Sequence, residues 1–448
     1  MSIAIYPLTS ALHDPQAVTA LTQEFLSSLG LPFELKDNDF ADYGSHDLDL
    51  IFVRTGGTEG IFKRLLPQLV AQSAKPFYLL ASDKSNSLAA SLEILSYLRQ
   101  QGLQGEILHG NAAYISNRIK MLQRVGEAAS RLRQCRLGVI GEPSDWLIAS
   151  NVDAETVRKK LGVELVSIPM SELLGTLATI PQVDEADVKS MLAISEASES
   201  VGCNCATVTS SSPTASGKVS SIADSLPDAY RIYLALKSLT EKYQLQGFTL
   251  RCFDLLDAVH NTGCWALAKL NSEDIVAGCE GDVPTMLTMM VVRALCGVSC
   301  FQANPASINP ETGEILFAHC TLPFDMVQRY ELDTHFESGI GVGIRGYVPE
   351  GPVTICKLAG DLSQAFVAEG ELLRCQAKAD LCRTQLVVRL DDPSQTAYFL
   401  TNPIGNHHVV VPGRYADALK ALLQGLKLCD EGHNAIYSSL CLEEAPSQ

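Results

Sequence analysis

The first 134 residues alternate short apolar runs with amphipathic stretches of helical length, and this alternation restricts the fold more than any other feature of the chain. "DLDLIFVRTGG" at 47–57 precedes "TEGIFKRLLPQLVAQ", and "KPFYLLASDKS" at 75–85 precedes "NSLAASLEILSYLRQQG". Short buried strands that are each followed by a helix form a parallel sheet, because the connection between two parallel strands must return across the sheet. We therefore expect residues 1–134 to form a Rossmann-like α/β domain.

A second α/β domain and a β-rich domain are expected after it. "CRLGVIG" begins a new apolar strand at Cys135, and "DAETVRKKLGVELVSIP" supplies a helix and a further strand. From about residue 303 the alternation with helices stops, and short strands are separated by turn residues. The predicted fold class is α/β, with Rossmann-like domains at 1–134 and 135–302, followed by a β-rich, barrel-like domain at 303–448 that carries the terminal helix "RYADALKALLQGLKL".

Composition disfavours several classes of partner. The chain of 448 residues has a formal net charge of -17 and no stripe of lysine or arginine, so nucleic acid and anionic membranes are not expected partners. The start lacks the pattern of a signal peptide, and the most apolar stretch, "MLTMMVVRALCGVSCF", is interrupted by Arg293 and too short to span a bilayer. We expect a cytoplasmic protein whose 14 cysteines are mostly reduced and buried.

Polar residues at the ends of apolar segments in the second half are the candidates for chemistry. Glu280 and Asp282 stand between the apolar "DIVAGC" and a strongly apolar helical pattern, and α/β proteins place ligands where a strand turns into a helix. The further candidates are Asn304 in "CFQANPASI", His319 in "LFAHCTLP", and the tandem His407 and His408 in "GNHHVVVPG". Because neighbouring side chains alternate along a strand, at most one of the tandem histidines is expected to face a shared site.

Each candidate also has a purely structural interpretation. Asp282 fits the cap of the following helix, Asn304 fits a turn before a proline, and His319 fits a core residue whose ring is hydrogen bonded. Taken together, a glutamate with an amide or carboxylate oxygen and one or two imidazoles is a ligand set for Mn²⁺, Fe²⁺, Co²⁺ or Zn²⁺. The spacing matches no compact metal-binding motif, so both interpretations stay open at this point.

A resemblance to a known family narrows the choice. "CEGDVPTMLTMMVVRALCG", "FQANP", "AHCTLP", "HFESGIGVGIRG" and "GNHHVVVPG", in this order, resemble the L-fucose isomerase and L-arabinose isomerase superfamily, particularly its shorter fucose-isomerase-like branch. The resemblance implies two α/β domains followed by a β-rich domain, and a homo-oligomer, trimer or hexamer. It also implies interconversion of aldoses and ketoses through an enediol at a divalent metal ion, usually Mn²⁺.

The resemblance implies roles for individual residues. Glu280 becomes both a metal ligand and an acid/base group, and His319 and His407 become imidazole ligands, with His408 as the alternative to His407. Asn304 stands where these isomerases present a second catalytic carboxylate. An amide oxygen binds a metal or a hydroxyl but takes no proton, so catalysis would need a substitute.

Two groups are candidates to replace the second carboxylate. Asp282 lies two residues from Glu280, and a hydroxide on the metal ion is the alternative. If Asn304 does act at the site, its amide oxygen is a candidate metal ligand.

Several residues outside this series are candidates to bind a sugar. Ser144, Asp145 and Trp146 follow the apolar strand "LGVIG", and an indole face beside hydroxyl and carboxylate groups suits a sugar ring. Packing at a domain interface is the structural alternative for Trp146. Arg54 lies in a glycine-rich turn after a strand and suits a phosphate or sulfonate, and His335 in "HFESG" is a further candidate. Arg345 and Arg414 could serve an anion equally.

The leading functional hypothesis is a metal-dependent aldose-ketose isomerase, an intramolecular oxidoreductase acting on a small-molecule sugar or sugar derivative. The alternative is a sugar-binding or regulatory protein on the isomerase scaffold, with Asn304 marking a lost carboxylate. Thiol chemistry at Cys264 or Cys279 is disfavoured, because an acidic neighbour such as Glu280 raises a thiol pKa.

Overall fold

The computed structural model describes residues 3–36, 40–183, 207–208, 222–426 and 436–437, and the chain divides into two compact units. Unit 1 comprises Met1–Ser130 and Ala421–Leu426, and unit 2 comprises Arg131–Lys420 and Lys427–Gln448. Each unit is described by itself below.

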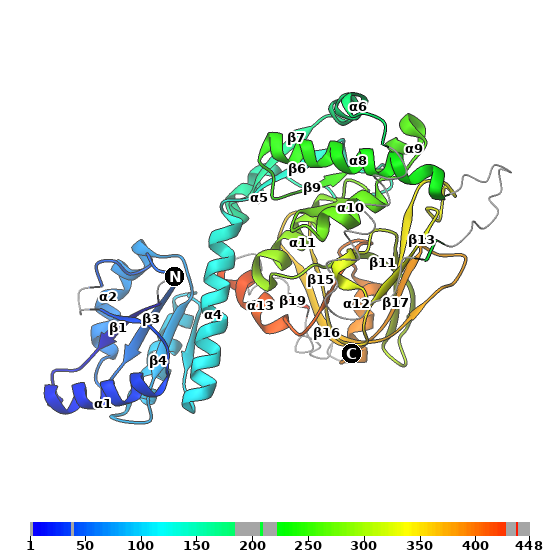
Figure 1. Ribbon diagram of the computed structural model, residues 1–448. Coiled ribbons are helices and arrows are strands. Elements are labelled where there is room, and N and C mark those ends of the chain that lie inside the picture. The colour runs from blue at the N-terminus through cyan, green and yellow to red at the C-terminus, as the bar shows by residue number, and fades with distance from the viewer. Residues whose placement is uncertain (1–2, 37–39, 184–206, 209–221, 427–435, 438–448) are drawn as a thin grey trace, which may run out of the picture. The chain divides into compact units, whose positions relative to one another are not determined.

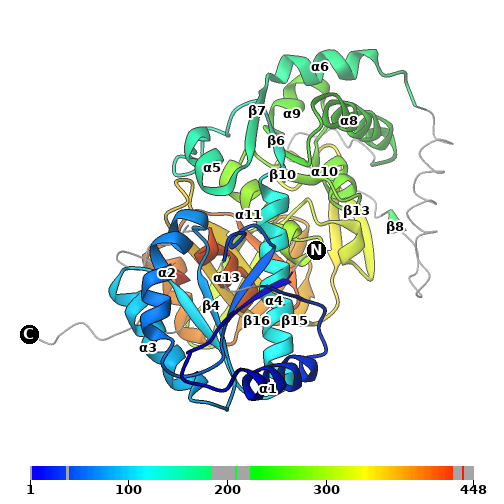
Figure 2. The same cartoon turned by 90° about the vertical axis from the view of Figure 1, so that its left-hand side faces the viewer.

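Unit 1 is a parallel sheet flanked by helices, in the order β2-β1-β3-β4-β5. Strands β1 and β3 are buried at every position, as expected of strands covered on both faces. Figure 2 shows α2 and α3 along one side of the sheet and α1 near its opposite side. The elements that begin in this unit are β1 (Ile3–Leu8), α1 (Pro15–Ser28), β2 (Glu34–Leu35), β3 (Leu48–Val53), α2 (Glu59–Gln72), β4 (Phe77–Ala81), α3 (Ser87–Gln100), β5 (Gly105–Leu108) and α4 (Ala112–Leu132).

Unit 2 begins with a second parallel sheet, in the order β10-β9-β6-β7. Its strands β9 and β10 are fully buried, and α8 (Ile222–Tyr243) and α10 (Cys264–Asn271) supply most of the helical residues in the apolar cluster around them. The elements of this layer are β6 (Arg136–Ile140), α5 (Ala154–Leu161), β7 (Glu164–Ile168), α6 (Met170–Thr179), α8 (Ile222–Tyr243), β9 (Gly247–Leu250), α9 (Asp254–Val259), α10 (Cys264–Asn271), β10 (Val276–Cys279) and α11 (Val283–Cys296).

The rest of unit 2 contains a closed six-stranded barrel, which confirms the predicted fold class together with the two parallel sheets. The order β15-β18-β11-β12-β17-β16 closes because β15 also pairs with β16. The barrel strands are β11 (Phe301–Asn309), β12 (Glu314–His319), β15 (Gly351–Leu358), β16 (Ala365–Gln376), β17 (Thr384–Leu390) and β18 (His408–Pro412). The other elements are β8 (Thr207–Val208), β13 (Arg329–Asp333), β14 (Gly343–Tyr347), α12 (Thr396–Thr401), α13 (Ala416–Gly425) and β19 (Ile436–Tyr437), with short 3-10 turns at Phe324–Met326 and Pro393–Gln395.

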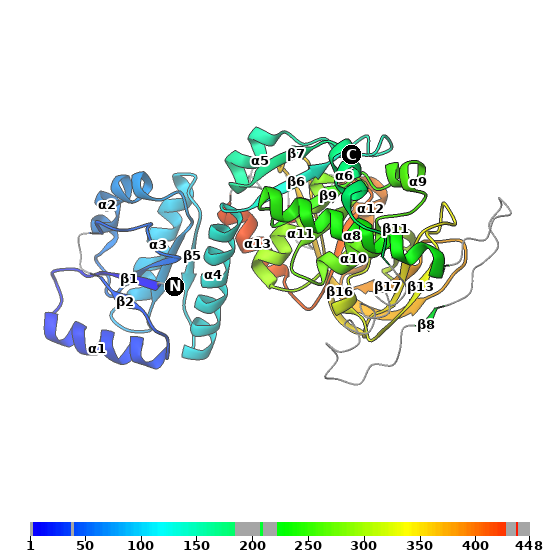
Figure 3. The same ribbon diagram turned by 45° about the horizontal axis from the view of Figure 1, so that its top comes forward.

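Helix α11 connects the parallel sheet with the barrel. It follows β10 directly, contacts β15 and β18, and lies beside the barrel strands in Figures 1 and 3. Thirteen of its 14 residues are buried, which explains why its sequence is apolar all round. The strand end that precedes α11 is therefore fixed relative to the barrel strands that α11 contacts.

The described cysteines form no disulfide, and most of them are buried. The ten described cysteines are all free thiols, and eight of them are buried. Within the described ranges, no helix is both long and apolar enough to cross a membrane.

The barrel core gives a direct test of the fold. Phe366 is fully buried and stacks on Tyr398 with ring centroids 3.9 Å apart. Phe366→Ala is expected to lower the free energy of unfolding of unit 2 by about 3–5 kcal/mol, because it leaves a cavity in a packed core. Urea denaturation followed by circular dichroism measures the change. Leu400→Ala is the control, since this α12 side chain is 57% exposed and should change stability little.

Candidate metal centre

Three donor side chains from distant segments of unit 2 converge on one point. Glu280 directly follows β10, His319 ends β12, and His407 directly precedes β18. Oε1 of Glu280 lies 3.5 Å from Nε2 of His319 and 3.4 Å from Nε2 of His407. One ligand atom from each residue lies within 4.8 Å of the other two. The group has the donor types and the spacing that suit a divalent metal ion.

Glu280 is held in a left-handed turn between β10 and α11. Its φ is 63° and that of Gly281 is 70°, and a non-glycine residue keeps such a φ only where its surroundings hold it. The backbone N–H of Ser144 donates to the carbonyl oxygen of Glu280 at 3.0 Å, and that of Gly281 donates to Leu250 at 2.9 Å. A Cβ on Gly281 would lie 2.6 Å from the carbonyl oxygen of Glu142. The turn therefore fixes the backbone position from which the Glu280 side chain extends.

His407 presents one ring nitrogen to Glu280 and the other to Asp282. The His407 side chain is fully buried, and its Nδ1 lies 2.8 Å from Oδ2 of Asp282. A carboxylate is an acceptor, so Nδ1 carries a hydrogen, and Nε2 is the nitrogen whose lone pair becomes available when the ring loses its second proton. This Nε2 is buried and makes no hydrogen bond to any described residue. A carboxylate behind the imidazole is the usual support for a histidine that binds a metal.

His319 offers its Nε2 in the same way. Ile315 and Phe317, on the same side of β12, belong to the barrel core, so alternation places His319 at the mouth of the barrel. Its Nδ1 lies 3.0 Å from Oγ1 of Thr321, and its ring centroid lies 5.3 Å from that of His407. One ring nitrogen is therefore satisfied within the protein, while the other faces Glu280.

Both carboxylates of the centre are ionised. Burial raises the pKa of Glu280, but the facing His407 and His319 outweigh burial and hold that pKa well below its usual range. Burial also raises the pKa of Asp282, and Lys357 and His407 outweigh it and lower that pKa. The centre therefore offers a negative charge to a cation.

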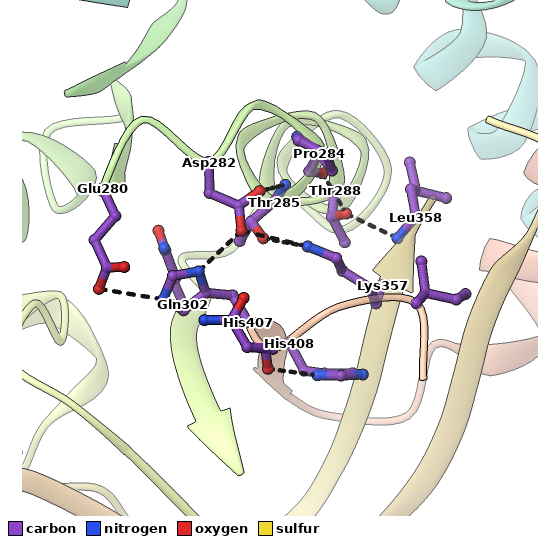
Figure 4. A network of polar contacts seen from close by, with 12 residues as sticks. Glu280, Asp282, Pro284, Thr285, Thr288, Gln302, Lys357, Leu358, His407 and His408 are labelled. Atoms are coloured by element: carbon purple, nitrogen blue, oxygen red, sulfur yellow. Dashed lines mark hydrogen bonds and ion pairs between the residues drawn. The ribbon is translucent and has the colours of Figure 1, made fainter. Parts of the chain in front are cut away.

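Asp282 performs two structural tasks besides its contact with His407. Its Oδ1 accepts a hydrogen bond from the backbone N–H of Thr285 at 2.8 Å, so it caps α11 as the structural interpretation predicted. Its Oδ2 also lies 3.5 Å from Nζ of Lys357, a lysine that is 1% exposed. Nζ of Lys357 donates to Oγ1 of Thr285 at 2.6 Å. Figure 4 shows this chain of contacts running from Glu280 through His407 and Asp282 to Lys357.

His408 points away from the centre, into the barrel. Its Nε2 lies 3.0 Å from the hydroxyl oxygen of Tyr398, and its ring packs on Phe366 and Phe399. Burial, with the charge of Lys357, lowers the pKa of His408 to about 3, so the ring is neutral. The alternation of neighbouring side chains therefore separates the two rings, and only His407 faces Glu280.

Trp146 approaches Glu280 from the carboxyl end of β6. Its Nε1–H donates to Oε2 of Glu280 at 2.6 Å, and its indole is 50% exposed. The indole packs edge-on against Phe253, and Phe253 in turn packs against His335. Ser144 is 3% exposed, and its Oγ has no hydrogen-bond partner among the described residues. Of the sugar-binding candidates, Trp146 and Ser144 thus contact Glu280 directly. His335 is connected to Trp146 through the ring of Phe253.

The other candidates lie further from the three donors or in another unit. Asp145 is 86% exposed at its side chain and forms an ion pair with Arg251 at 3.0 Å. Arg54 belongs to unit 1. Two further arginines that suited an anion have carboxylate partners, because Arg345 pairs with Asp333 and Arg414 with Asp391.

The amide that touches the Glu280 strand is Gln302, not Asn304. Oε1 of Gln302 accepts from the backbone N–H of Cys279 at 2.8 Å, and its Nε2 donates to the Cys279 carbonyl oxygen at 3.3 Å. Asn304 lies two residues further along the same face of β11, opposite Ala318, and is partly buried. Sequence reasoning missed Gln302 and Lys357. Two signals in the sequence could have indicated them. Gln302 is two residues from Asn304 and so shares its face of β11, and Lys357 is a single lysine in the apolar run of β15.

Comparison with known proteins gives partial matches to proteins that share one name. No family model matches the chain. It is 22% identical over 245 residues to a protein named sulfoquinovose isomerase from Alkalicoccus urumqiensis, covering 52% of this chain and 49% of that protein. A protein of the same name from Clostridium sp. (strain MSTE9) is 24% identical over 208 residues, covering 46% and 42%. The matches thus span about half the length of these curated relatives.

The contact between His407 and Asp282 is expected to support metal binding. Asp282→Asn keeps an oxygen that can cap α11 but replaces the anionic acceptor of the His407 Nδ1 hydrogen. The affinity for Mn²⁺ should fall about 10–100-fold, because the support behind a metal-binding histidine contributes that much. Competition with a fluorescent chelator measures the affinity. Asp153→Asn is the matched control, since Asp153 also caps a helix, α5, and is exposed. An equal loss in both variants would contradict the expectation.

Metal affinity is also expected to depend on pH. Burial lowers the pKa of His407 in the metal-free protein, but Glu280 and Asp282 outweigh it and raise that pKa to about 9. An ion must displace this proton, so affinity should rise as the pH rises toward 9, by up to about tenfold per pH unit. Titrations with Mn²⁺ at several pH values below 9 measure the slope. An affinity that does not change with pH would show that no proton is displaced.

Proposed function

We propose that this chain is a metal-dependent aldose-ketose isomerase that moves a proton between adjacent carbons of a small-molecule sugar. The observation that carries the proposal is the convergence of Glu280, His319 and His407 at the carboxyl edge of the central sheet. The partial matches to proteins named sulfoquinovose isomerase support the same reaction class. The resemblance further leads us to propose a homotrimer or homohexamer.

The proposed metal ligands are Oε1 of Glu280 and the Nε2 atoms of His319 and His407. The buried Nε2 of His407 makes no hydrogen bond within the described part of the chain, so it is available to an ion that displaces its proton. We take Mn²⁺ as the first ion to test, because the donor set mixes oxygen and nitrogen. When bound, the ion supplies Lewis-acid polarisation of the sugar oxygens, which makes the neighbouring C–H acidic.

Glu280 is the proposed group that moves the proton. It is the carboxylate among the three donors, its side chain is 12% exposed, and the indole N–H of Trp146 donates to its Oε2. Asp282 is proposed as a positioning residue, because its oxygens contact Thr285, His407 and Lys357 and its side chain is fully buried. Asn304 takes no proton, so its proposed role is restricted to binding an oxygen atom of the substrate or the ion.

The sugar is proposed to lie against Trp146. Its half-exposed indole offers an apolar face for a sugar ring. The hydroxyl of Ser144, which no described residue pairs with, and the ring of His335 are proposed to bind sugar hydroxyls. Asp145, exposed on the same loop, is proposed to contact the outer edge of the sugar. The relatives are named for a sugar that bears a sulfo group, so acidic sugars belong first in a substrate panel.

The test combines metal content with proton exchange. Purified protein loaded with Mn²⁺ is incubated in D₂O with sulfoquinovose, pentoses, 6-deoxyhexoses and other acidic sugars, and NMR follows ketose formation and deuterium at the exchanging carbon. Glu280→Gln is expected to lower turnover by about 10²-fold or more, because an amide takes no proton. It should also lower the bound metal measured by mass spectrometry. Glu155→Gln, an exposed change on α5, is the control.

The outcomes separate the two functional hypotheses. Ketose formation that Glu280→Gln removes and Glu155→Gln leaves intact supports the isomerase. A sugar that stabilises the metal-loaded protein thermally but gives neither product nor deuterium exchange supports a binding protein on the same scaffold. Neither metal binding nor turnover with any sugar of the panel would contradict the proposal.

A further inference from the structure

Unit 1 contains a pocket at the carboxyl end of its sheet, and none of its lining residues is a donor of the metal centre. The pocket has a volume of about 300 Å³ and lies between α1 and the loops that follow β3 and β4. Its apolar side includes Val18, Phe25 and Phe52. Its polar side includes Arg54 from the loop after β3 and the run from Ser82 to Ser85 after β4.

The position of the pocket follows from the topology of unit 1. In the order β2-β1-β3-β4-β5, the chain goes from β1 to one side of the sheet and then returns to the other side with β3. Open parallel sheets bind ligands beyond the carboxyl ends of their strands near such a change of direction. Arg54 directly follows β3, and by alternation it shares a face with Phe52, which packs on Phe25 of α1.

The guanidinium of Arg54 lacks the partners that buried arginines normally have. Its Nε is buried without a hydrogen-bond partner, and no carboxylate of the described residues forms an ion pair with it. Burial lowers the pKa of Arg54, and an arginine guanidinium remains charged in proteins. Arg54 is partly buried, and a partly desolvated charge without a described partner is unfavourable, so a bound anion would stabilise it.

The loops around Arg54 are held in place by hydrogen bonds. The backbone N–H of Arg54 donates to Leu8 of β1 at 2.9 Å, and that of Gly56 donates to Ser85 at 2.8 Å. The helices α2 and α3 begin in these two loops, and neither N-cap side chain makes a capping hydrogen bond. Their N-terminal ends therefore add partial positive charge near the pocket.

We propose that this pocket binds a small organic oxyanion, a phosphate or sulfonate attached to a short carbon skeleton. The Arg54 fork would bind the oxyanion, Lys84 would add a second positive charge at the rim, and the apolar side would contact the carbon skeleton. Two carboxylates, Glu24 and Asp83, also line the pocket, and Asp83 pairs with Lys84 at 3.5 Å. Both are exposed to solvent, so they weaken the attraction less than a buried carboxylate would. The residues that line the pocket all belong to unit 1, whereas the three donors of the metal centre belong to unit 2, so the two sites share no residue.

The test measures binding of methyl phosphate and methanesulfonate to the full chain by calorimetry near neutral pH. Arg54→Gln is expected to weaken binding of the preferred probe about tenfold or more, because it removes a charged hydrogen-bond donor. Arg54→Lys should retain part of the affinity, since it keeps the charge but loses the planar fork. Arg64→Gln on α2 is the matched control, an exposed arginine outside the pocket, and should bind as the parent does.

Two further variants keep the result decisive. If Arg54→Gln does not fold, Lys84→Gln replaces an exposed rim lysine and should weaken binding about threefold without affecting the core. Glu280→Gln should leave probe affinity unchanged, which separates this pocket from the metal centre. The tighter probe identifies the anion as phosphate or sulfonate. Failure of both probes to bind the parent chain, equal binding by Arg54→Gln, or loss of binding in Glu280→Gln would overturn the proposal.

Discussion

The hydrogen bond between His407 and Asp282 is the contact on which the arrangement of the centre depends. It holds Nδ1 against Asp282, turns Nε2 toward Glu280, and ties the barrel mouth to the N-terminus of α11. Lys357 then supplies the positive charge that a buried carboxylate needs. Asp282 thus caps α11, orients His407 and pairs with Lys357. Because one side chain makes all three contacts, the positions of α11, His407 and Lys357 depend on one another.

Much of the architecture follows from sequence periodicity. The alternation of apolar runs and helical patterns predicted the two parallel sheets, and the loss of that alternation near residue 303 predicted a β-rich segment. Periodicity describes each segment separately, so it says little about pairing between distant strands. Closure of the barrel rests on the contact of β15 with both β16 and β18, and local sequence does not encode that pairing.

The candidate site shows the same division between local and distant information. The position of Glu280 after a strand and the alternation of the tandem histidines were both readable from sequence. The contact of Trp146 with Glu280 was not, since sequence suggested a stacking or packing role and gave no sign that the indole N–H meets a carboxylate. The role of Gln302 was not predicted for a related reason. Its partner is the backbone of Cys279, at the end of β10 in the parallel sheet, and local sequence does not indicate that contact.

The three donors of the centre come from segments that are far apart along the chain, two of them in the barrel and one at the end of an open sheet. An unfolded chain would present them as independent groups with no shared geometry. An ion held between them would therefore bind the folded unit and not the unfolded chain, so its binding free energy would add to the stability of unit 2. The free energy of unfolding of unit 2 would then increase with the fraction of centres that hold an ion.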